Sequence, residues 1–488
     1  MSAGRGSLAI VLHTHMPYVE GFGTWPFGEE WLWEAIAGSY LPLLDLLDRG
    51  APLTLSLTPV LCDQLEAPGI GERFATFIGE VRRGTHEQDA AGMRAGGHEA
   101  LAAEIDRSWG DYVGALEAFE RRDRRLLEAL ARHAQWTSSA THAILPLLAS
   151  DAGMRLQIHS GVESYRRRVS GHWRGGFWLP ECAYAPWLGR ALEDAGVSAV
   201  CVELTNLFGL GAAQHLRPLR SEEGVVLVPI DRATMSLVWS EQGYPASGAY
   251  RDYHHHTIHH HNPWNNAGGT YDHAAALALA REHAADFVTR TLARLAQGSD
   301  SPELAAAGGG LVVCALDTEL LGHWWYEGID WLAAVVEECA RQGLELVRLD
   351  DALERVEAVP IAQLPECESL LAGVGEGQAS SWGLGGNLST WSAPAVADMA
   401  FATRAAELAV LAAGARVSTT AIRELLALQA SDWAFMTSRE IAVPYARERF
   451  EGHHRALAEA LRGGEPQGDL QRLRNLAVDA DRGSLLAP

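Results

Sequence analysis

The chain has 488 residues, of which 48% are hydrophobic, and its formal net charge at pH 7 is −23. This length accommodates about three domains of ordinary size, and the acidic balance excludes electrostatic binding to a nucleic-acid backbone. All 39 basic residues are arginine, which excludes lysine Schiff-base chemistry and a lysine-containing phosphate loop.

Neither a membrane protein nor a secreted protein is indicated. No segment approaches the roughly 20 apolar residues of a membrane helix. The short apolar run at residues 8–12 lacks the basic flank and cleavage site of a signal peptide. The six cysteines lie far apart and form no C-x-x-C pair, which argues against a zinc ribbon or a disulfide framework. A cytoplasmic protein without membrane association is expected.

Short apolar runs rich in β-forming residues recur over the first 350 positions, with helical patterns between several of them. The runs are residues 7–12, 53–58, 155–159, 176–179, 198–203, 225–230, 235–239, 311–316 and 344–349. This alternation predicts an α/β fold with a parallel sheet, and seven to eight units suggest a closed β/α barrel.

Two segments interrupt the alternation. Residues 63–157 are charged and helical in pattern, and they predict an inserted helical domain. The catalytic barrel would then comprise residues 1–62 and 158–360. Beyond residue 360 the pattern is again helical, so residues 361–488 predict a C-terminal helical domain packed on the barrel.

Polar side chains follow the predicted strands, at the ends that converge on the active-site face of a β/α barrel. These residues are His13, His15, His159, Glu181, Glu203, Asp231 and Asp317. Strand ends are often polar for structural reasons alone. That explanation accounts for one or two such residues better than for a ring of histidines and carboxylates.

Glu181 and Asp317 differ from the other strand-end acids because each ends a wholly apolar strand beside aromatic residues. Glu181 lies between Trp178 and Tyr184, and Asp317 precedes Trp324. Glycosyl transfer needs one carboxyl that attacks or stabilises the anomeric carbon and another that protonates the leaving oxygen. Apolar neighbours raise the pKa of the proton donor and keep it protonated near neutral pH.

Longer motifs accompany these acids in a fixed order. They are HTHMPY at 13–18, EWLWEA at 30–35, TH at 141–142, WLPECAY at 178–184, LDTELLGHWWYEG at 316–328, SSWG at 380–383 and LQASDW at 428–433. Together they resemble glycoside hydrolase family 57, and within it the 1,4-α-glucan branching enzymes. The resemblance extends over nearly the whole chain, from residue 8 to about residue 455.

The resemblance implies a distorted (β/α)7 barrel and a retaining mechanism that needs no cofactor. It implies Glu181 as nucleophile and Asp317 as proton donor, acting on α-1,4-glucan donor and acceptor chains. A monomer is expected. The side chains expected to contact the glucan are His13, His15, Trp31, His142, Tyr244, Trp264, Trp382, Trp391 and Asp432.

Two histidine motifs have a second interpretation. His13 and His15 share one face of a strand, as metal ligands do in polysaccharide deacetylases. No Cys or Asp partner is evident, so hydrogen bonds to sugar hydroxyls are preferred and no metal is expected. Residues 254–261 contain six histidines, which could bind a transition metal or respond to pH. The preferred interpretation is a polar loop leading to Trp264.

The chain departs from the family at three places. The histidine run stands where a mixed segment containing an arginine is expected. Ile441 lies near the position of a glutamine that contacts substrate in branching enzymes, and Leu384 replaces a residue that is usually acidic.

Residues 239–250 form a predicted loop, rich in Gly, Ser and Pro, with Tyr244 near its tip. It is either a plain surface turn or a lid that excludes water, so that a sugar hydroxyl attacks the glycosyl-enzyme. The Gly-Tyr-Pro element resembles that of branching enzymes. An α-amylase or a 4-α-glucanotransferase on the same scaffold is the competing hypothesis. A catalytically silent glucan-binding protein is another, although it need not retain both acids.

Overall fold

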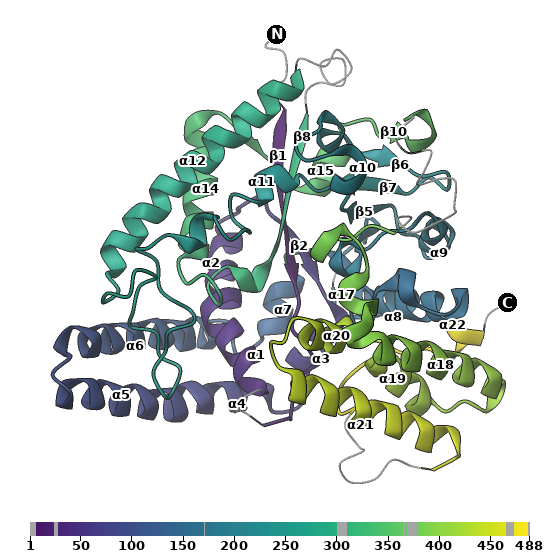
Figure 1. Ribbon diagram of the computed structural model, residues 1–488, viewed down its shortest axis with the longest axis horizontal. Coiled ribbons are helices and arrows are strands. Elements are labelled where there is room, and N and C mark those ends of the chain that lie inside the picture. Colours follow the sequence, from purple (N-terminus) through teal and green to yellow (C-terminus); the bar gives the residue numbers. More distant parts are fainter. Residues whose placement is uncertain are drawn as a thin grey trace.

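The computed structural model describes residues 6–23, 28–169, 171–299, 310–364, 367, 379–464 and 473–486. Its centre is a curved sheet whose main parallel strands lie side by side in the order β7, β5, β4, β3, β2, β1, β8 (Figure 1). These strands are β1 (Ser7–Thr14), β2 (Thr54–Leu57), β3 (Ala134–Ser138), β4 (Gly176–Trp178), β5 (Ala199–Val202), β7 (Val226–Pro229) and β8 (Leu311–Asp317). Three two-residue strands extend the sheet, namely β6 (Leu219–Arg220), β9 (Glu345–Leu346) and β10 (Val359–Pro360).

The sheet curls until its two ends meet. The backbone N–H of Asp231, directly after β7, donates a hydrogen bond of 2.9 Å to the carbonyl of Val313 on β8. The prediction of a distorted β/α barrel is therefore confirmed. β1 is buried along its full length, because helices cover its sheet from outside and side chains fill it from inside. Helices α12 (His273–Ser299) and α14 (Gly328–Gln342) pack against each other beside β8 (Figure 1).

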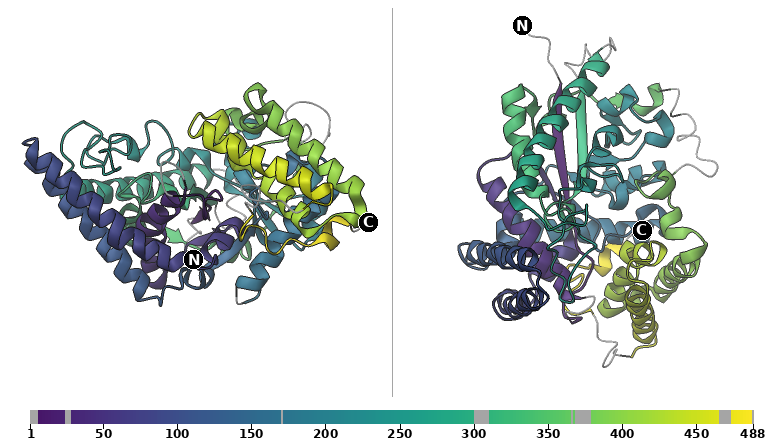
Figure 2. Two further views of the ribbon diagram at one scale, coloured as in Figure 1. Left: turned by 90° about the horizontal axis from the view of Figure 1, so that it is seen from below. Right: turned by 60° about the vertical axis from the view of Figure 1, so that its left-hand side comes forward.

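Between β2 and β3 the chain forms helices α3 (Pro59–Leu65), α4 (Ile70–Thr76), α5 (Arg83–Ala95), α6 (Glu99–Glu120) and α7 (Leu126–Ala131). Helices α5 and α6 lie side by side and project from the barrel, as the views in Figures 1 and 2 agree. The predicted insertion extended too far, since its last part contains β3, a full member of the sheet. β3 reads Ala-Gln-Trp-Thr-Ser, which is too short and too polar to show an apolar run.

Two predicted strands are wrong. Residues 155–159 lie inside helix α8 (Asp151–Arg168), where Ser150 caps the first turn by accepting a hydrogen bond from the Gly153 N–H. His159 is therefore on a helix and not at a strand end. Residues 235–239 follow helix α11 (Arg232–Met235), which Asp231 caps in the same way through Thr234. Short apolar runs do not distinguish a buried strand from the buried face of a helix.

The C-terminal part is helical, as predicted, and comprises α18 (Ala397–Ala413), α19 (Thr419–Leu428), α20 (Ser431–Ser438) and α21 (Val443–Leu461). Its apolar core includes Tyr18, Val60 and Leu156 from the barrel side, so the two parts share buried surface. Figure 2 shows these helices packed together against one side of the barrel.

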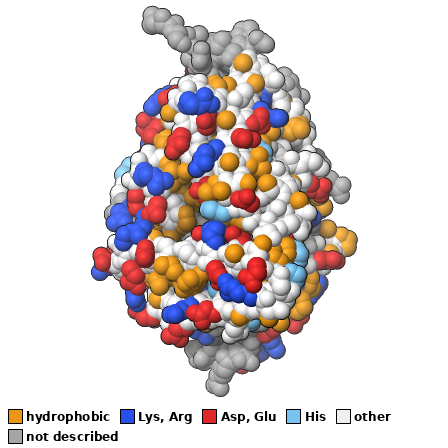
Figure 3. Space-filling model, turned by 90° about the vertical axis from the view of Figure 1, so that its left-hand side faces the viewer, with side chains coloured by type: hydrophobic (Ala, Val, Ile, Leu, Met, Phe, Trp, Pro, Cys, Tyr) orange, Lys and Arg blue, Asp and Glu red, His pale blue; other side chains and the backbone are white. Residues whose placement is uncertain are grey.

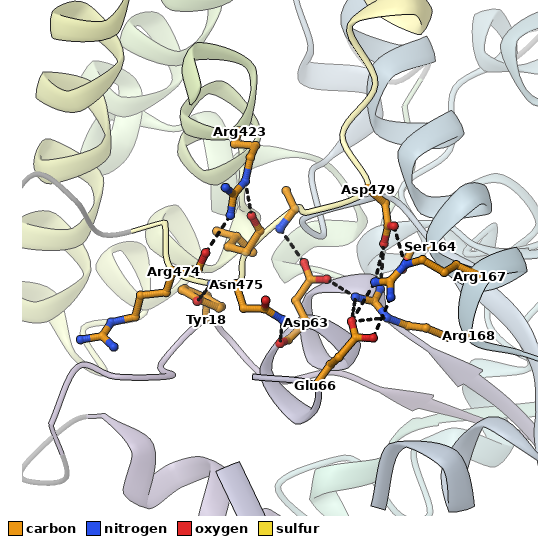
Figure 4. A network of polar contacts seen from close by, with 12 residues as sticks. Tyr18, Asp63, Glu66, Ser164, Arg167, Arg168, Arg423, Arg474, Asn475 and Asp479 are labelled. Carbon is orange, nitrogen blue, oxygen red and sulfur yellow. Dashed lines mark hydrogen bonds and ion pairs between the residues drawn. The ribbon is translucent and has the colours of Figure 1, made fainter. Parts of the chain in front are cut away.

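The last described segment, residues 473–486, joins both parts through buried polar contacts (Figure 4). Asp63 accepts a 2.6 Å hydrogen bond from the Ala477 N–H and pairs with Arg168 at 2.6 Å. Arg423 of α19 donates to the carbonyls of Leu476 and Arg474, at 2.8 and 2.9 Å. We call these contacts the C-terminal clamp.

Among the described helices, none has the length and apolar character that crossing a membrane requires. On the face seen in Figure 3, acidic and basic side chains are interspersed and form no basic patch.

Candidate active site

The two candidate acids occupy neighbouring positions at the carboxyl ends of the barrel strands. Asp317 is the last residue of β8, paired in register with His13 of β1. Glu181 follows β4 in a 3₁₀ turn, Pro180–Cys182, and has a left-handed backbone with φ of 61°. A non-glycine residue in this conformation is strained, and such strain concentrates at functional sites. Both side chains are partly exposed, so both face an opening in the barrel.

Different neighbours act on the two carboxyl groups. Burial raises the pKa of Glu181 to about 7, whereas a hydrogen bond from Trp382 and the nearby His15 oppose that rise. The Trp382 indole N–H donates to Glu181 Oε2 at 2.7 Å. Burial raises the pKa of Asp317 well above its usual value, and the carboxylates of Glu181 and Glu319 raise it further. Burial raises both pKa values, but only Glu181 has neighbours that oppose the rise, which suits Glu181 to the ionised role and Asp317 to the protonated one.

Three histidine rings form a stack beside these acids. The ring centroids of His15 and His142 are 3.9 Å apart, and those of His13 and His142 are 5.0 Å apart. His13 also stacks on the buried ring of Trp178 at 4.4 Å. Burial lowers the pKa of His13 and of His142 well below the usual value, so both rings are neutral near pH 7. A neutral imidazole offers one donor and one acceptor to a ligand hydroxyl.

The helical domain completes the site. His15 Nε2 lies 2.9 Å from Asp432 Oδ1, and His142 Nδ1 lies 2.8 Å from the hydroxyl of Ser431, both at the start of α20. Burial lowers the pKa of His15, but Asp432, Glu319 and Glu181 together outweigh burial, and the pKa is raised overall. The other carboxylate oxygen of Asp432 is buried and has no hydrogen-bond partner among the described residues. It is an acceptor available to a bound molecule.

The cluster of His15, His142 and Asp432 also contains side chains that could bind a metal ion. Potential ligand atoms of His15, His142 and Asp432 all lie within 4.8 Å of one another. No carboxylate partner for the two strand histidines was evident in the sequence, but the folded chain supplies one, Asp432. The ligand atoms are already bonded to protein groups, since His15 Nε2 contacts Asp432 and His142 Nε2 lies 2.9 Å from His13 Nε2. A metal ion would have to displace these bonds.

The four expected groove tryptophans lie in different surroundings. Trp382 binds Glu181 and packs against Trp178, with ring centroids 5.2 Å apart. Trp31 is half-buried and lines a cavity of about 500 Å³. One face of the Trp264 ring is covered by His255, which stacks on it at 3.9 Å.

Trp391 lines a second cavity, of about 140 Å³, whose other walls come from residues 144–148 and the helical domain. It is 2% exposed and packs in a small core with Ile144 and Ala183. Gly383 allows this position, because a Cβ there would come within 2.8 Å of the Trp391 ring. The sequence did not show how deeply the ring is buried, and its expected contact with glucan stays a prediction.

Tyr244 does not extend over the acids, as a free lid tip would. Its hydroxyl donates to Asp286 Oδ2 of α12 at 2.7 Å, and its ring stacks on His283 at 4.5 Å. The loop residue that reaches the site is Trp239. Its side chain is 41% exposed and its ring lies edge-on to Trp382, with centroids 4.9 Å apart. An aromatic residue at the start of a Gly- and Pro-rich loop was the signal available in the sequence.

Glu319 is a third carboxylate that sequence reasoning missed. It accepts hydrogen bonds from the Tyr40 hydroxyl at 2.6 Å and from the His15 backbone N–H at 3.1 Å. Burial raises its pKa to about 7. Its position two residues after Asp317 was the only available signal. The remaining strand-end acids are structural: Asp231 is buried against Arg294 at 3.0 Å, and Glu203 pairs with Arg232 at 3.4 Å.

Comparison with known proteins adds independent findings. The family described as glycosyl hydrolase family 57 matches residues 135–365, and the family described as 1,4-alpha-glucan branching enzyme, C-terminal, matches residues 395–478. A 1,4-alpha-glucan branching enzyme of Thermococcus kodakarensis is 31% identical over 94% of this chain and 74% of its own length. A probable 1,4-alpha-glucan branching enzyme of Mycobacterium tuberculosis is 30% identical over 98% of this chain and 95% of its own length.

The same similarity is found among solved structures. The crystal structure of a GH57-type branching enzyme from the hyperthermophilic archaeon Pyrococcus horikoshii has a TM-score of 0.86 and 30% sequence identity. The match covers 99% of this chain and 97% of that chain, so it includes the barrel, the insertion and the helical domain.

Proposed function

Since the chain belongs to glycosyl hydrolase family 57, we propose that it is a 1,4-α-glucan branching enzyme, which cleaves α-1,4 bonds and forms α-1,6 branches. The observation that carries this proposal is the unequal setting of the two acids. Glu181 has groups that stabilise its anion, whereas every neighbour acting on Asp317 favours its protonated form. Relatives named as branching enzymes, similar over nearly the full chain, indicate the reaction among those this scaffold supports.

In the first half of the mechanism, Glu181 attacks the anomeric carbon of an α-1,4-linked glucose unit. Asp317 gives its proton to the departing glycosidic oxygen, and a covalent glycosyl-enzyme forms. The buried oxygen of Asp432 that has no partner among the described residues is positioned to accept a hydrogen bond from a hydroxyl of the reacting sugar. The neutral rings of His13 and His142 bond to each other at 2.9 Å, so a sugar hydroxyl that binds them takes the place of that bond.

In the second half, Asp317 removes the proton from the 6-hydroxyl of an acceptor glucan. That oxygen attacks the anomeric carbon, Glu181 departs, and an α-1,6 bond is formed with the original anomeric configuration. Branching requires that this hydroxyl attacks before water does, so the site must exclude water while the glycosyl-enzyme exists.

Incubation with amylose tests the reaction. A branching enzyme lowers iodine staining while releasing few new reducing ends, and a debranching enzyme then liberates short chains from the product. A steep rise in reducing ends would identify an α-amylase. A change in chain lengths without debranchable linkages would identify a 4-α-glucanotransferase.

The variant Glu181→Gln tests the assigned nucleophile. The amide is close in shape to the carboxylate but is not a nucleophile, so transfer should fall by about a thousandfold or more. Circular dichroism and the thermal midpoint report whether the variant is folded. Turnover at the wild-type rate in a folded variant would contradict the assignment.

We also propose that the protein acts as a monomer in the cytoplasm, in the synthesis of glycogen or a related glucan. The six free and buried cysteines support a reducing compartment. Sedimentation of the purified protein tests the monomer, and the branch content of glucan from cells lacking the gene tests the pathway.

A further inference from the structure

A cavity of about 500 Å³ lies next to the candidate active site, outside the set of residues that hold the two acids. Its walls come from three segments. They are helix α1 (Glu29–Ala35) with the turn after it, the loop that follows β8, and the histidine-rich loop at residues 253–262. The insertion contributes Arg82, directly before α5, and Ser108, Asp111 and Tyr112 of α6 to one end.

The cavity borders the Asp317 side of the site. Its lining includes Gly322, His323 and Trp324, from the loop that begins directly after Asp317. It includes no residue of the segment after β4, which carries Glu181, nor Trp382, which binds Glu181. In a retaining mechanism the proton donor faces the leaving chain, and the acceptor later enters on that same side. The position of the cavity therefore fits the acceptor.

The lining combines aromatic platforms with a carboxylate. Trp324 is 44% exposed and lies against Tyr253, with ring centroids 4.5 Å apart, and Trp31 is half-buried on another wall. Glu30 contacts Arg82 at 3.1 Å through Oε1, the single ion pair that the described residues give it. Its second oxygen can accept hydrogen bonds. Flat rings stack on the faces of glucose units while carboxylates accept bonds from their hydroxyls.

The histidine run forms one wall because α5 holds it in place. Arg82 Nη1 donates to the carbonyl of His259 at 2.8 Å, and its Nε donates to Glu34 Oε1 at 2.6 Å. His259 Nδ1 also lies 2.6 Å from Asp89. These contacts hold the loop in place, and His254, His256 and His260 line the cavity.

We propose that this cavity binds the acceptor α-glucan chain, with glucose units on Trp31 and Trp324 and hydroxyls bonded to Glu30 and the histidine run. This inference rests on the proposed transferase function and extends it. It also gives the insertion a role, because α5 fixes one wall of the acceptor site.

A donor with a small leaving group separates donor from acceptor binding. With maltoheptaosyl fluoride, fluoride release measures formation of the glycosyl-enzyme, since fluoride needs no chain-binding subsite. Amylose is then added at increasing concentration, and the glycosyl group is partitioned between water and acceptor. The measured quantity is the amylose concentration at which half of the glycosyl groups are transferred.

The variants Trp324→Ala and Glu30→Gln should each raise that concentration by about tenfold, the effect of losing one good contact. Phe401→Ala is the control, because Phe401 is 75% exposed on α18 in the helical domain and should behave as wild type. The proposal would be overturned if Trp324→Ala and Glu30→Gln both transferred half of their glycosyl groups at the same amylose concentration as the wild-type enzyme. So would equal losses in fluoride release and transfer, which would assign the cavity to the donor.

Analysis of the glycosidic linkages in the product tests the branching function separately from the acceptor role of the cavity. If the wild-type enzyme joins chains only through α-1,4 bonds, the branching function is refuted. The acceptor concentration still decides the role of the cavity, because it does not depend on which bond is formed.

Discussion

At Glu181 two hydrogen bonds tie the candidate nucleophile to a residue 201 positions away. Trp382 donates its indole N–H to Oε2 of the carboxylate, and the Trp382 backbone N–H donates to the Glu181 carbonyl at 2.9 Å. The indole thereby fixes the orientation of the carboxylate and stabilises its charged form. Trp382 packs edge-on against Trp178, and His13 stacks on Trp178, so Glu181 lies beside a continuous group of aromatic rings.

The pH dependence of the reaction follows from the pKa of Glu181, which is about 7. The nucleophile must be ionised, so kcat/KM should fall as the pH drops through about 7. Asp317 must be protonated, and burial together with the carboxylates of Glu181 and Glu319 raises its pKa, which favours that form. Because the two groups interact, the profile reports the titration of the pair. A flat profile between pH 5 and 8 would contradict this account.

The variant Trp382→Phe removes the indole N–H and keeps a flat ring. A lost hydrogen bond to a charged group costs about 1.5–3 kcal/mol, so kcat/KM should fall by roughly 10- to 100-fold. Since that bond lowers the pKa of Glu181, its removal should move the acidic limb of the profile to higher pH by about one pH unit. A merely structural role would lower the rate without moving the limb.

The sequence predicts the two acids because each lies at the end of a buried strand and precedes aromatic residues. The contacts that hold the site together could not be predicted from the sequence. Trp382 and Asp432 reach the site from the far end of the chain, and their contacts depend on how two domains pack. How deeply the Trp391 ring is buried could not be predicted either, because its packing depends on Ile144 and Ala183, which are distant in the sequence.

At the scale of elements, the loop at residues 239–250 combines a fixed part and an exposed part. Tyr244 is held on α12 by Asp286 and His283. Trp239, five residues earlier, is exposed and touches Trp382. The function expected of Tyr244 is therefore better suited to Trp239, which lies where it can cover the glycosyl-enzyme.

Trp239→Ala should open the site to water and lower the ratio of branching to hydrolysis by about threefold or more. The ratio is measured from debranchable linkages and reducing ends on the same amylose sample. Tyr244→Phe, which loses only the bond to Asp286, is the matched comparison and should change the ratio less. The opposite order of effects would return the lid role to Tyr244.

At the scale of the whole molecule, the barrel and the helical domain share one core, one catalytic site and the C-terminal clamp. Alternating patterns predicted the barrel and the helical end correctly, because long amphipathic repeats are strong signals. The clamp was not predicted, since residues 473–486 carry no periodic pattern. Its order comes from polar contacts such as that between Asp63 and the Ala477 N–H, 414 residues apart.

Asp63→Ala should weaken the clamp. Arg168, whose side chain is 3% exposed, would lose a buried partner, and the Ala477 N–H would lose its acceptor. The free energy of unfolding should fall by about 2–4 kcal/mol, measured by chemical denaturation. The control is Glu163→Ala, which removes an exposed ion pair with Arg166 and should cost less than about 1 kcal/mol. Equal effects would show that the clamp does not stabilise the fold.

The contact between His15 and Asp432 has a consequence for how the enzyme is made. The two residues are 417 positions apart, and Ser431, which orients His142, lies beside Asp432. At a synthesis rate of roughly 5–20 residues per second, the ribosome needs about 20 seconds or more to travel from one to the other. Throughout that time the nascent barrel carries both acids but lacks the far wall of its sugar site. A glucan chain near the ribosome therefore meets an unfinished enzyme, and cleavage begins only after the start of α20 has been synthesised and has packed on the barrel.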